Sequence, residues 1–267
     1  MKKTLKRIAP AMLVLMALAS LSFMAKDGVT LRLKPQQGKT YTIISKATTM
    51  NMMEVQGQTI NQSQNMDIKQ TFSVKKVTDD QSVFETQVES MKMSVSQMGM
   101  KFEYDSEHPE KTSPMIAAQT KDFEKSIKKL STITYDLLGN VVNDSDDLDM
   151  NQLGNVIIKL PKEELAIGSQ WTMDKTVSIS EMEIKSTMTY TVTAITKKSI
   201  ELSIKGVVKE GSEGVNGTWD GTVSINPQTG MVTKSTTKSN ISMTISEQGL
   251  SIPVTAVGNT TVTVEEK

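Results

Sequence analysis

Apolar and polar residues alternate with a period of two through most of this chain. Every second residue from 66 to 74 belongs to one set, and the residues between them are polar. That set is Met66, Ile68, Gln70, Phe72 and Val74. Successive side chains of a strand point to opposite faces of a sheet, so this pattern is typical of an antiparallel strand with one buried face. Similar runs, separated by turn signals, fill both halves of the chain, so the sequence predicts a mainly β fold of curved antiparallel sheet.

One segment departs from the strand pattern. Thr112-Ser113-Pro114 is a helix-start signal, because Ser or Thr caps a helix and Pro suits its first turn. No breaker follows before Leu130, and the apolar residues Phe123 and Ile127 fall near one side. The sequence therefore predicts one amphipathic helix over about residues 114–130, packed on the sheet of the first half.

Three stretches of the first half recur in the same order in the second. They are Gly38–Thr42 with Gly168–Thr172, Thr71–Asp80 with Thr189–Lys198, and Tyr135-Asp136, Gly139 and Val141 with Ile225-Asn226, Gly230 and Val232. We interpret this as an internal duplication of one β-meander, with a first half over residues 26–159 and a second over 160–267. The stretch Leu160–Trp171 marks the joint, and Trp171 is expected to anchor the core there. The sequence leaves open whether the halves share one sheet or form two lobes.

The N-terminus has the layout of a secretory signal. A basic start, Met1–Arg7, precedes an apolar run, Ile8–Leu21, that is short for a bilayer span, and small residues follow. We expect residues 1–25 to be a signal peptide cleaved between 19 and 25, the alternative being an uncleaved anchor. The chain has no cysteine, so it is not expected to be a lipoprotein. The expected location is the periplasm or the exterior, with no membrane span after cleavage.

Composition argues against several classes of function. Without cysteine and with His108 as the only histidine, most nucleophilic triads and zinc sites cannot be assembled. The 30 basic and 30 acidic residues balance, and no basic block suggests a nucleic-acid partner. The acidic segment Asp144–Asp149 has a spacing suited in part to calcium, although a solvated loop is the simpler interpretation. We therefore predict a non-enzymatic protein with no catalytic residues, no metal site and no cofactor.

Methionine is unusually frequent, and fifteen of the 19 residues lie outside the expected signal. Three interpretations stay open: ordinary core filling, an adaptable apolar groove, and a thioether site for a soft metal such as Cu(I). For the groove, the speculative ligand-binding residues are Met50, Met52, Met91, Met93, Met100, Phe102, Phe123 and Ile127. The ligand would be a lipid or another apolar small molecule held between sheet and helix. The alternatives are an envelope scaffold or interaction module without a pocket and, less favoured, a hydrolase.

A family resemblance supports this outline. Leu31-Arg32-Leu33, Gly38 with Tyr41, Tyr104-Asp105-Ser106 and the Leu-Pro…Ile-Gly-x-x-Trp motif of residues 160–171 resemble an uncharacterised family of secreted Gram-negative bacterial proteins, a domain of unknown function. The resemblance implies a β-rich envelope protein and no assigned activity. A meander with a helix against its face also looks, by analogy of fold alone, like the clam-shaped periplasmic carriers of lipoproteins.

Overall fold

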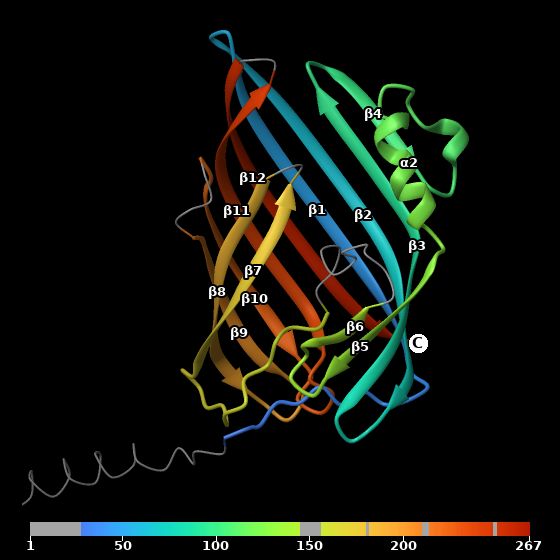
Figure 1. The fold of residues 1–267 in the computed structure, drawn as a ribbon, viewed down its shortest axis with the longest axis vertical. Helices are drawn as coiled ribbons and strands as arrows, with labels where there is room; N and C mark the ends of the chain where they lie inside the picture. Colours follow the sequence, from blue (N-terminus) through green and yellow to red (C-terminus); the bar gives the residue numbers. More distant parts are fainter. Residues whose placement is uncertain (1–27, 145–155, 180–181, 210–213, 248–249) are drawn as a thin grey trace, which may run out of the picture.

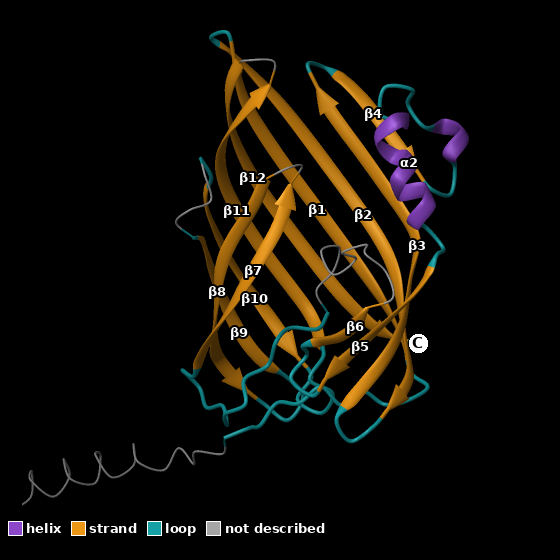
Figure 2. Ribbon diagram, in the orientation of Figure 1, coloured by secondary structure: helices purple, strands orange, loops and turns teal. Residues whose placement is uncertain are grey.

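Most of the described chain is β-strand (Figure 2). The computed structural model describes residues 28–144, 156–179, 182–209, 214–247 and 250–267, so the expected signal and the acidic segment after Asp144 lie outside it. The strands are β1 Thr40–Val55, β2 Gln58–Val77, β3 Gln81–Gln97, β4 Met100–Asp105, β5 Leu130–Asp136, β6 Val141–Asp144, β7 Gln170–Ile179, β8 Met182–Ile195, β9 Ile200–Val208, β10 Asn216–Ile225, β11 Val232–Glu247 and β12 Leu250–Glu266. A 3₁₀ turn, η1 (Pro109–Lys111), and a helix, α2 (Ala117–Ser126), follow β4.

The strands form one antiparallel sheet, which confirms the predicted mainly β, curved antiparallel fold. Its order is β6-β5-β3-β2-β1-β12-β11-β10-β9-β8-β7, with β4 paired to β3. The pairing of β1 with β12 runs from Tyr41–Glu266 to Met53–Val254 and joins the two halves into a continuous surface. The sheet curls, so that β7 crosses in front of β10 and β11 in Figure 1 and the sheet has a concave side.

The halves repeat local geometry where they match in sequence. Gly38 and Gly168 both have positive φ, at 84° and 89°. The N–H of Gly38 donates to the carbonyl oxygen of Val74 (2.9 Å), and that of Gly168 donates to Val192 (2.8 Å). Each glycine thus starts the first strand of its half against the second. A duplication stays our proposal, and this repetition supports it.

An extended segment precedes β1 and another precedes β7, and both lie at one end of the sheet. Backbone at Arg32, ahead of β1, lies against Gly230 in the turn between β10 and β11. Backbone at Ile158, ahead of β7, lies against Gly139 in the turn between β5 and β6, and the carbonyl oxygen of Val156 accepts a hydrogen bond from the N–H of Val232 (2.9 Å). Both segments therefore contact the second half from within residues 26–159, which ties the two halves together at one end of the sheet.

The main core fills this end of the concave side. It combines residues of both halves with the two extended segments, namely Leu31, Leu33, Tyr41, Ile43, Phe72, Val74, Phe84, Ile133, Tyr135, Val156, Ile158, Leu160, Leu165, Tyr190, Val192, Ile200, Leu202, Ile204, Val223, Ile225, Met231, Val232 and Val262. Burial of so many apolar side chains is the main stabilising contribution to the fold. We call this the core end of the sheet.

Helix α2 is shorter than the predicted span of residues 114–130. Ser113, expected as a cap, instead accepts a hydrogen bond at Oγ from the N–H of Glu103 in β4 (2.9 Å). The helix stops after Ser126 because the N–H of Lys128 donates to the carbonyl oxygen of Val88 in β3 (2.8 Å). Tertiary hydrogen bonds to the sheet therefore set both limits. No helix in the described ranges is long and apolar enough to cross a membrane.

Candidate ligand-binding face

Five of the eight speculative ligand-binding residues come together beneath α2. Met91 and Met93 are buried there, and Phe102, Phe123 and Ile127 pack against the same cluster. The other members are Ile68, Val88, Tyr104, Ile116, Met66 and Val95. Because these side chains pack on one another, they occupy the space between sheet and helix in which we expected a ligand. The concave side beyond the helix is the better candidate.

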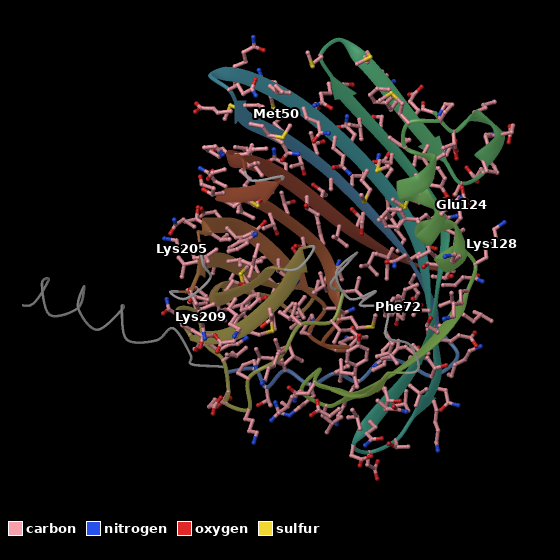
Figure 3. The ribbon with its side chains drawn as sticks, turned by 45° about the horizontal axis from the view of Figure 1, so that its top comes forward. Met50, Phe72, Glu124, Lys128, Lys205 and Lys209 are labelled. Atoms are coloured by element: carbon pink, nitrogen blue, oxygen red, sulfur yellow. The ribbon has the colours of Figure 1, made fainter. Side chains whose placement is uncertain are left out.

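The remaining three residues lie elsewhere. Met50 and Met52 have the strand parity opposite to the buried Tyr41 and Ile43, so they face away from the core and are exposed. Met100 is exposed at the far end of β4. In Figure 3, Met50 lies far along the sheet from Phe72 of the core end. The structure therefore does not gather the predicted methionines into one groove.

A row of residues crosses the concave face above the main core. Direct cross-strand pairs place Trp219 of β10 beside Gly206 of β9, Gly206 beside Met188 of β8, and Met188 beside Met173 of β7. Trp219, Met188 and Met173 are all half-buried. Their parity is that of the core residues, and Met173 and Met188 pack against the edge of the main core. The row is therefore an apolar lining that side chains only partly cover.

Gly206 makes this lining continuous. A Cβ at this position would collide with the sulfur of Met188 and would lie 3.1 Å from the Cβ of Trp219. The Met188 side chain occupies the space that a larger residue would fill, so the thioether lies over the strand beside the indole. Close approach of this kind is a common reason for glycine inside a strand.

On its other side, Trp219 is followed by small and polar residues. It pairs with Ser239 of β11, Ser239 with Gly258 of β12, and Gly258 with Thr49 of β1. A Cβ at Gly258 would lie 2.6 Å from Oγ of Ser239. The concave face is thus apolar toward β7 and shallow and polar toward β1, which suits an elongated ligand with one polar end.

Two buried hydroxyl groups strengthen the polar side. Ser45 and Thr86 have the concave parity on β1 and β3, and in the described structure neither hydroxyl has a hydrogen-bond partner. Buried polar groups without partners are uncommon, and bound water or a ligand usually satisfies them. They therefore mark places on this face where a polar group would be stabilised.

The two edges of the sheet approach each other at a pocket of about 510 Å³. It is lined by Tyr135, Gly139, Asn140, Val141, Ile157, Ile158, Lys159, Thr172, Met173, Asp174 and Lys175. Met173 belongs both to this pocket and to the apolar row. The Trp171 indole N–H donates to the carbonyl oxygen of Lys159 (3.0 Å), and its ring stacks on Tyr190 at 5.3 Å. Burial raises the pKa of Tyr190 to about 12, so its hydroxyl stays neutral.

Groups suited to catalysis are not assembled in the described residues. His108 is exposed, with Nδ1 3.4 Å from Oε1 of Glu110. Within the described ranges, no three His, Cys, Asp or Glu residues form a group that could hold a metal ion. Alternation puts Trp219 on one strand face with Val223 and Ile225, but it does not tell which part of that face stays uncovered. No other sequence signal identifies the three residues of the row that sequence reasoning missed, Trp219, Met188 and Met173.

Part of the chain is similar to a known protein family. Residues 150–232 match the model of a family of unknown function, DUF6263. The match confirms the expected resemblance to an uncharacterised family and supplies no activity. No curated protein matches the chain.

Among solved structures, the chain is similar to lipovitellin, in a structure concerned with lipid–protein interactions. The TM-score is 0.50 at 10% identity, and the match covers 86% of this chain and 25% of that one. The chain thus spans a quarter of the lipovitellin chain, and the likeness is one of fold alone.

Two further matches have low TM-scores. An outer membrane channel from Pseudomonas putida F1 has a TM-score of 0.24 at 9% identity, covering 86% of this chain and 97% of that one. The translocator domain of the autotransporter NalP from Neisseria meningitidis has a TM-score of 0.21 at 8% identity, covering 94% and 96%.

Proposed function

We propose that this protein is a non-enzymatic protein of the cell envelope that holds a lipid or similar apolar ligand on its concave face. The observation that carries the proposal is the row of Trp219, Met188 and Met173, which continues from the edge of the core along that face and stays half-exposed. Partly exposed apolar linings with a few polar groups are typical of ligand sites. Lipovitellin, whose own structure concerns lipid–protein interactions, has a similar fold.

The chemistry of the face favours a long-chain amphiphile. The aromatic and thioether side chains offer an adaptable apolar surface, because methionine fits ligands of varied shape. The hydroxyls of Ser239, Thr49 and, deeper, Ser45 lie toward β1 and would receive a carboxylate or an ester. Location in the periplasm or outside the cell belongs to the same proposal and rests on the expected signal at residues 1–25.

A paired substitution on one strand tests this proposal. Ser239 lies beside Trp219 on the concave face, and its neighbour Asn240 points to the opposite face and is exposed. We expect Ser239→Glu to weaken binding of a long-chain fatty acid about tenfold, because it places a negative charge where the carboxylate of the ligand would bind. Asn240→Glu should bind as the parent does. Parent and variants are compared in a Trp171→Phe background, so that titration with the fatty acid follows the fluorescence emission of Trp219 alone.

The expected result is a saturable blue shift of Trp219 emission in the parent and in Asn240→Glu. If the emission does not change on adding fatty acid, or if both glutamate variants bind equally, the concave face is not the ligand site. Thermal unfolding of the two variants, measured alongside, verifies that both are folded.

A further inference from the structure

Two neighbouring rows of residues on the concave face contain no charged side chain. The first runs from Phe102 of β4 to Met173 of β7, and the second, one row nearer the core end, runs from Tyr104 to Trp171. Each strand that the sheet places between β4 and β7 contributes one residue to each row. All of these residues are apolar, small, hydroxyl-bearing or amide-bearing. We call them the two uncharged rows.

The outer face of the same strands is charged. The outer row that lies between the two uncharged rows contains four charged residues, namely Glu103, Lys238, Asp220 and Lys205. In the next outer row toward the core end, Nζ of Lys92 lies 2.9 Å from Oδ2 of Asp105. The lack of charge is therefore a property of the concave face and does not reflect the composition of these strands.

Burial does not explain this lack of charge, because much of the two rows is only partly covered. Thr49, Ser239, Trp219 and Met188 are half-buried, and Thr260 is exposed. Positions that water can reach usually accept Lys or Glu, as the outer face does here. The two uncharged rows therefore need another explanation, and an uncharged ligand lying over them supplies one.

The polar groups of these rows are hydroxyls and an amide. Thr49 pairs with Gln64 on β2 and with Gly258 on β12, and Gly258 pairs with Ser239 on β11. A Cβ at Gly258 would lie 2.6 Å from Oγ of Ser239 and 3.7 Å from Oγ1 of Thr49, so both hydroxyls border the surface of this glycine. Nε2 of Gln64 donates to the sulfur of Met93 (3.3 Å), which is a weak acceptor. Such groups form hydrogen bonds with an ester or a hydroxyl, but they supply no positive charge.

A buried hydroxyl next to the rows has the same character. Ser45 lies two residues before Ala47 on β1, so it shares the concave parity. It is 5% exposed, and its hydroxyl has no hydrogen-bond partner in the described part of the chain. A neutral polar group would satisfy it without bringing a charge into the interior.

A charged head group would lack a counter-charge beside these hydroxyls. Buried charges in proteins are paired, because removing an ion from water is costly. The cross-strand neighbours of Thr49 and Ser239 are all uncharged. Lys175 has the parity of Met173, but it lies on the edge strand β7, in the pocket that also contains Tyr135.

We propose that the ligand of the concave face is an uncharged long-chain lipid, an ester or an alcohol, in preference to an ionised fatty acid or a phospholipid. The inference rests on the proposed function and narrows its class of ligand. The acyl chain lies over Trp219, Met188 and Met173, and the ester or hydroxyl lies over Gly258. A fatty acid binds the same face more weakly, because its carboxylate leaves water without gaining a counter-charge.

Titration with two lipids of equal chain length tests this inference. The probes are 1-monomyristoylglycerol and myristic acid, added to the Trp171→Phe protein at about pH 8, where a carboxylic acid is ionised. We expect the monoacylglycerol to shift the Trp219 emission with a Kd about tenfold lower than that of the fatty acid. Titration at a pH below the carboxyl pKa should bring the two Kd values together, since the protonated acid is neutral as well.

Ser239→Lys and Asn240→Lys supply the missing cation on opposite faces of one strand. Ser239→Lys should reverse the preference, so that the fatty acid binds more tightly than the monoacylglycerol, because the ammonium group pairs with the carboxylate. Asn240 faces outward and is exposed, so Asn240→Lys should keep the preference of the parent. Thermal unfolding verifies that both variants are folded.

The outcomes separate this inference from the proposed function. If myristic acid binds the parent as tightly as the monoacylglycerol at about pH 8, the inference is overturned and the proposed function stands. The same lipid preference in both lysine variants would also overturn it. If neither lipid changes the Trp219 emission, the inference and the proposed function fail together. The comparison of the two lipids needs only the parent, so it holds even if a lysine variant does not fold.

Discussion

Two glycines show how single residues hold this fold together. Gly139 and Gly230 have φ of 76° and 69°, and each lies against the backbone of an extended segment, at Ile158 and at Arg32 respectively. Positive φ explains a glycine in a turn, but the close approach adds a second requirement. An added Cβ at Gly139 would lie 2.5 Å from the carbonyl oxygen of Ile158.

A matched pair of glycine substitutions separates the two requirements. Gly57 has φ of 78°, and a Cβ added there would have no neighbour within 4 Å. Gly57→Ala should therefore cost about 1–2 kcal/mol in free energy of unfolding, for backbone strain alone. We expect Gly139→Ala to cost about 1–3 kcal/mol more, because the backbone of residue 158 must move. Urea unfolding measures both values, and equal losses would show that the contact with residue 158 is unimportant.

At the scale of the element, one β-bulge explains a change of parity within β3. Val88 and Met91 share the concave face although their positions differ by three, and same-face residues of a regular strand differ by an even number. The register shifts there, with Gln70 opposite Val88 and Lys69 opposite Ser90, so Glu89 is the extra residue. Glu89 Oε2 lies 2.7 Å from Nζ of Lys69, and this ion pair lowers the pKa of the carboxyl group.

The turn between β5 and β6 depends on an ionised carboxylate. Oδ1 of Asp136 accepts hydrogen bonds from the N–H groups of Leu138 (2.8 Å) and Asn140 (2.9 Å), and Oδ2 accepts one from Nδ2 of Asn140 (2.7 Å). Burial raises the pKa of Asp136, but these hydrogen bonds outweigh it, so the net pKa lies below the usual value.

This lowered pKa predicts a pH-dependent effect of Asp136→Asn. A folded-state pKa below the unfolded one gives stability that is complete above the unfolded pKa and is lost as pH falls through the folded pKa. The variant should lose about 1–2 kcal/mol near neutral pH, where charge-assisted hydrogen bonds count fully. The difference from the parent should shrink in acid, below the usual aspartate pKa. Denaturant unfolding at several pH values checks this, and a difference independent of pH would contradict it.

At the scale of the whole molecule, the halves share one sheet and one core. Leu31 and Leu33 precede β1 in the first half, yet they are buried in the same cluster as Val223 and Val232 of the second. The pairing of β1 with β12 crosses the boundary between the halves. The expected boundary at residue 160 is therefore a proposal about ancestry that need not describe two separate folding units.

Separate expression of residues 26–159 and 160–267 tests this dependence. Each fragment lacks an extended segment or a strand that packs on it in the whole chain, so neither should show a cooperative thermal transition by circular dichroism. Mixing the fragments should restore a transition. Cooperative unfolding of either fragment alone would show instead that the halves are independent domains.

The sequence by itself determined the type of most elements. Strand alternation, the turn glycines and the match of Gly38 with Gly168 are local signals, since they depend on residues close in the chain. The helix was predicted in the correct place, but its predicted span was too long. Ser113 and Lys128 form hydrogen bonds with strands rather than with helix backbone.

Only the tertiary structure decided which faces of these strands are buried and which are exposed. Met50 and Met91 have similar local patterns, yet one is exposed on the outer face and the other is buried beneath α2. Trp219 meets Met188 and Met173 through strands that lie far apart in the chain, so no local pattern could assemble the concave row. A period of two shows that a strand has two faces, and the curl of the sheet decides which of them is concave.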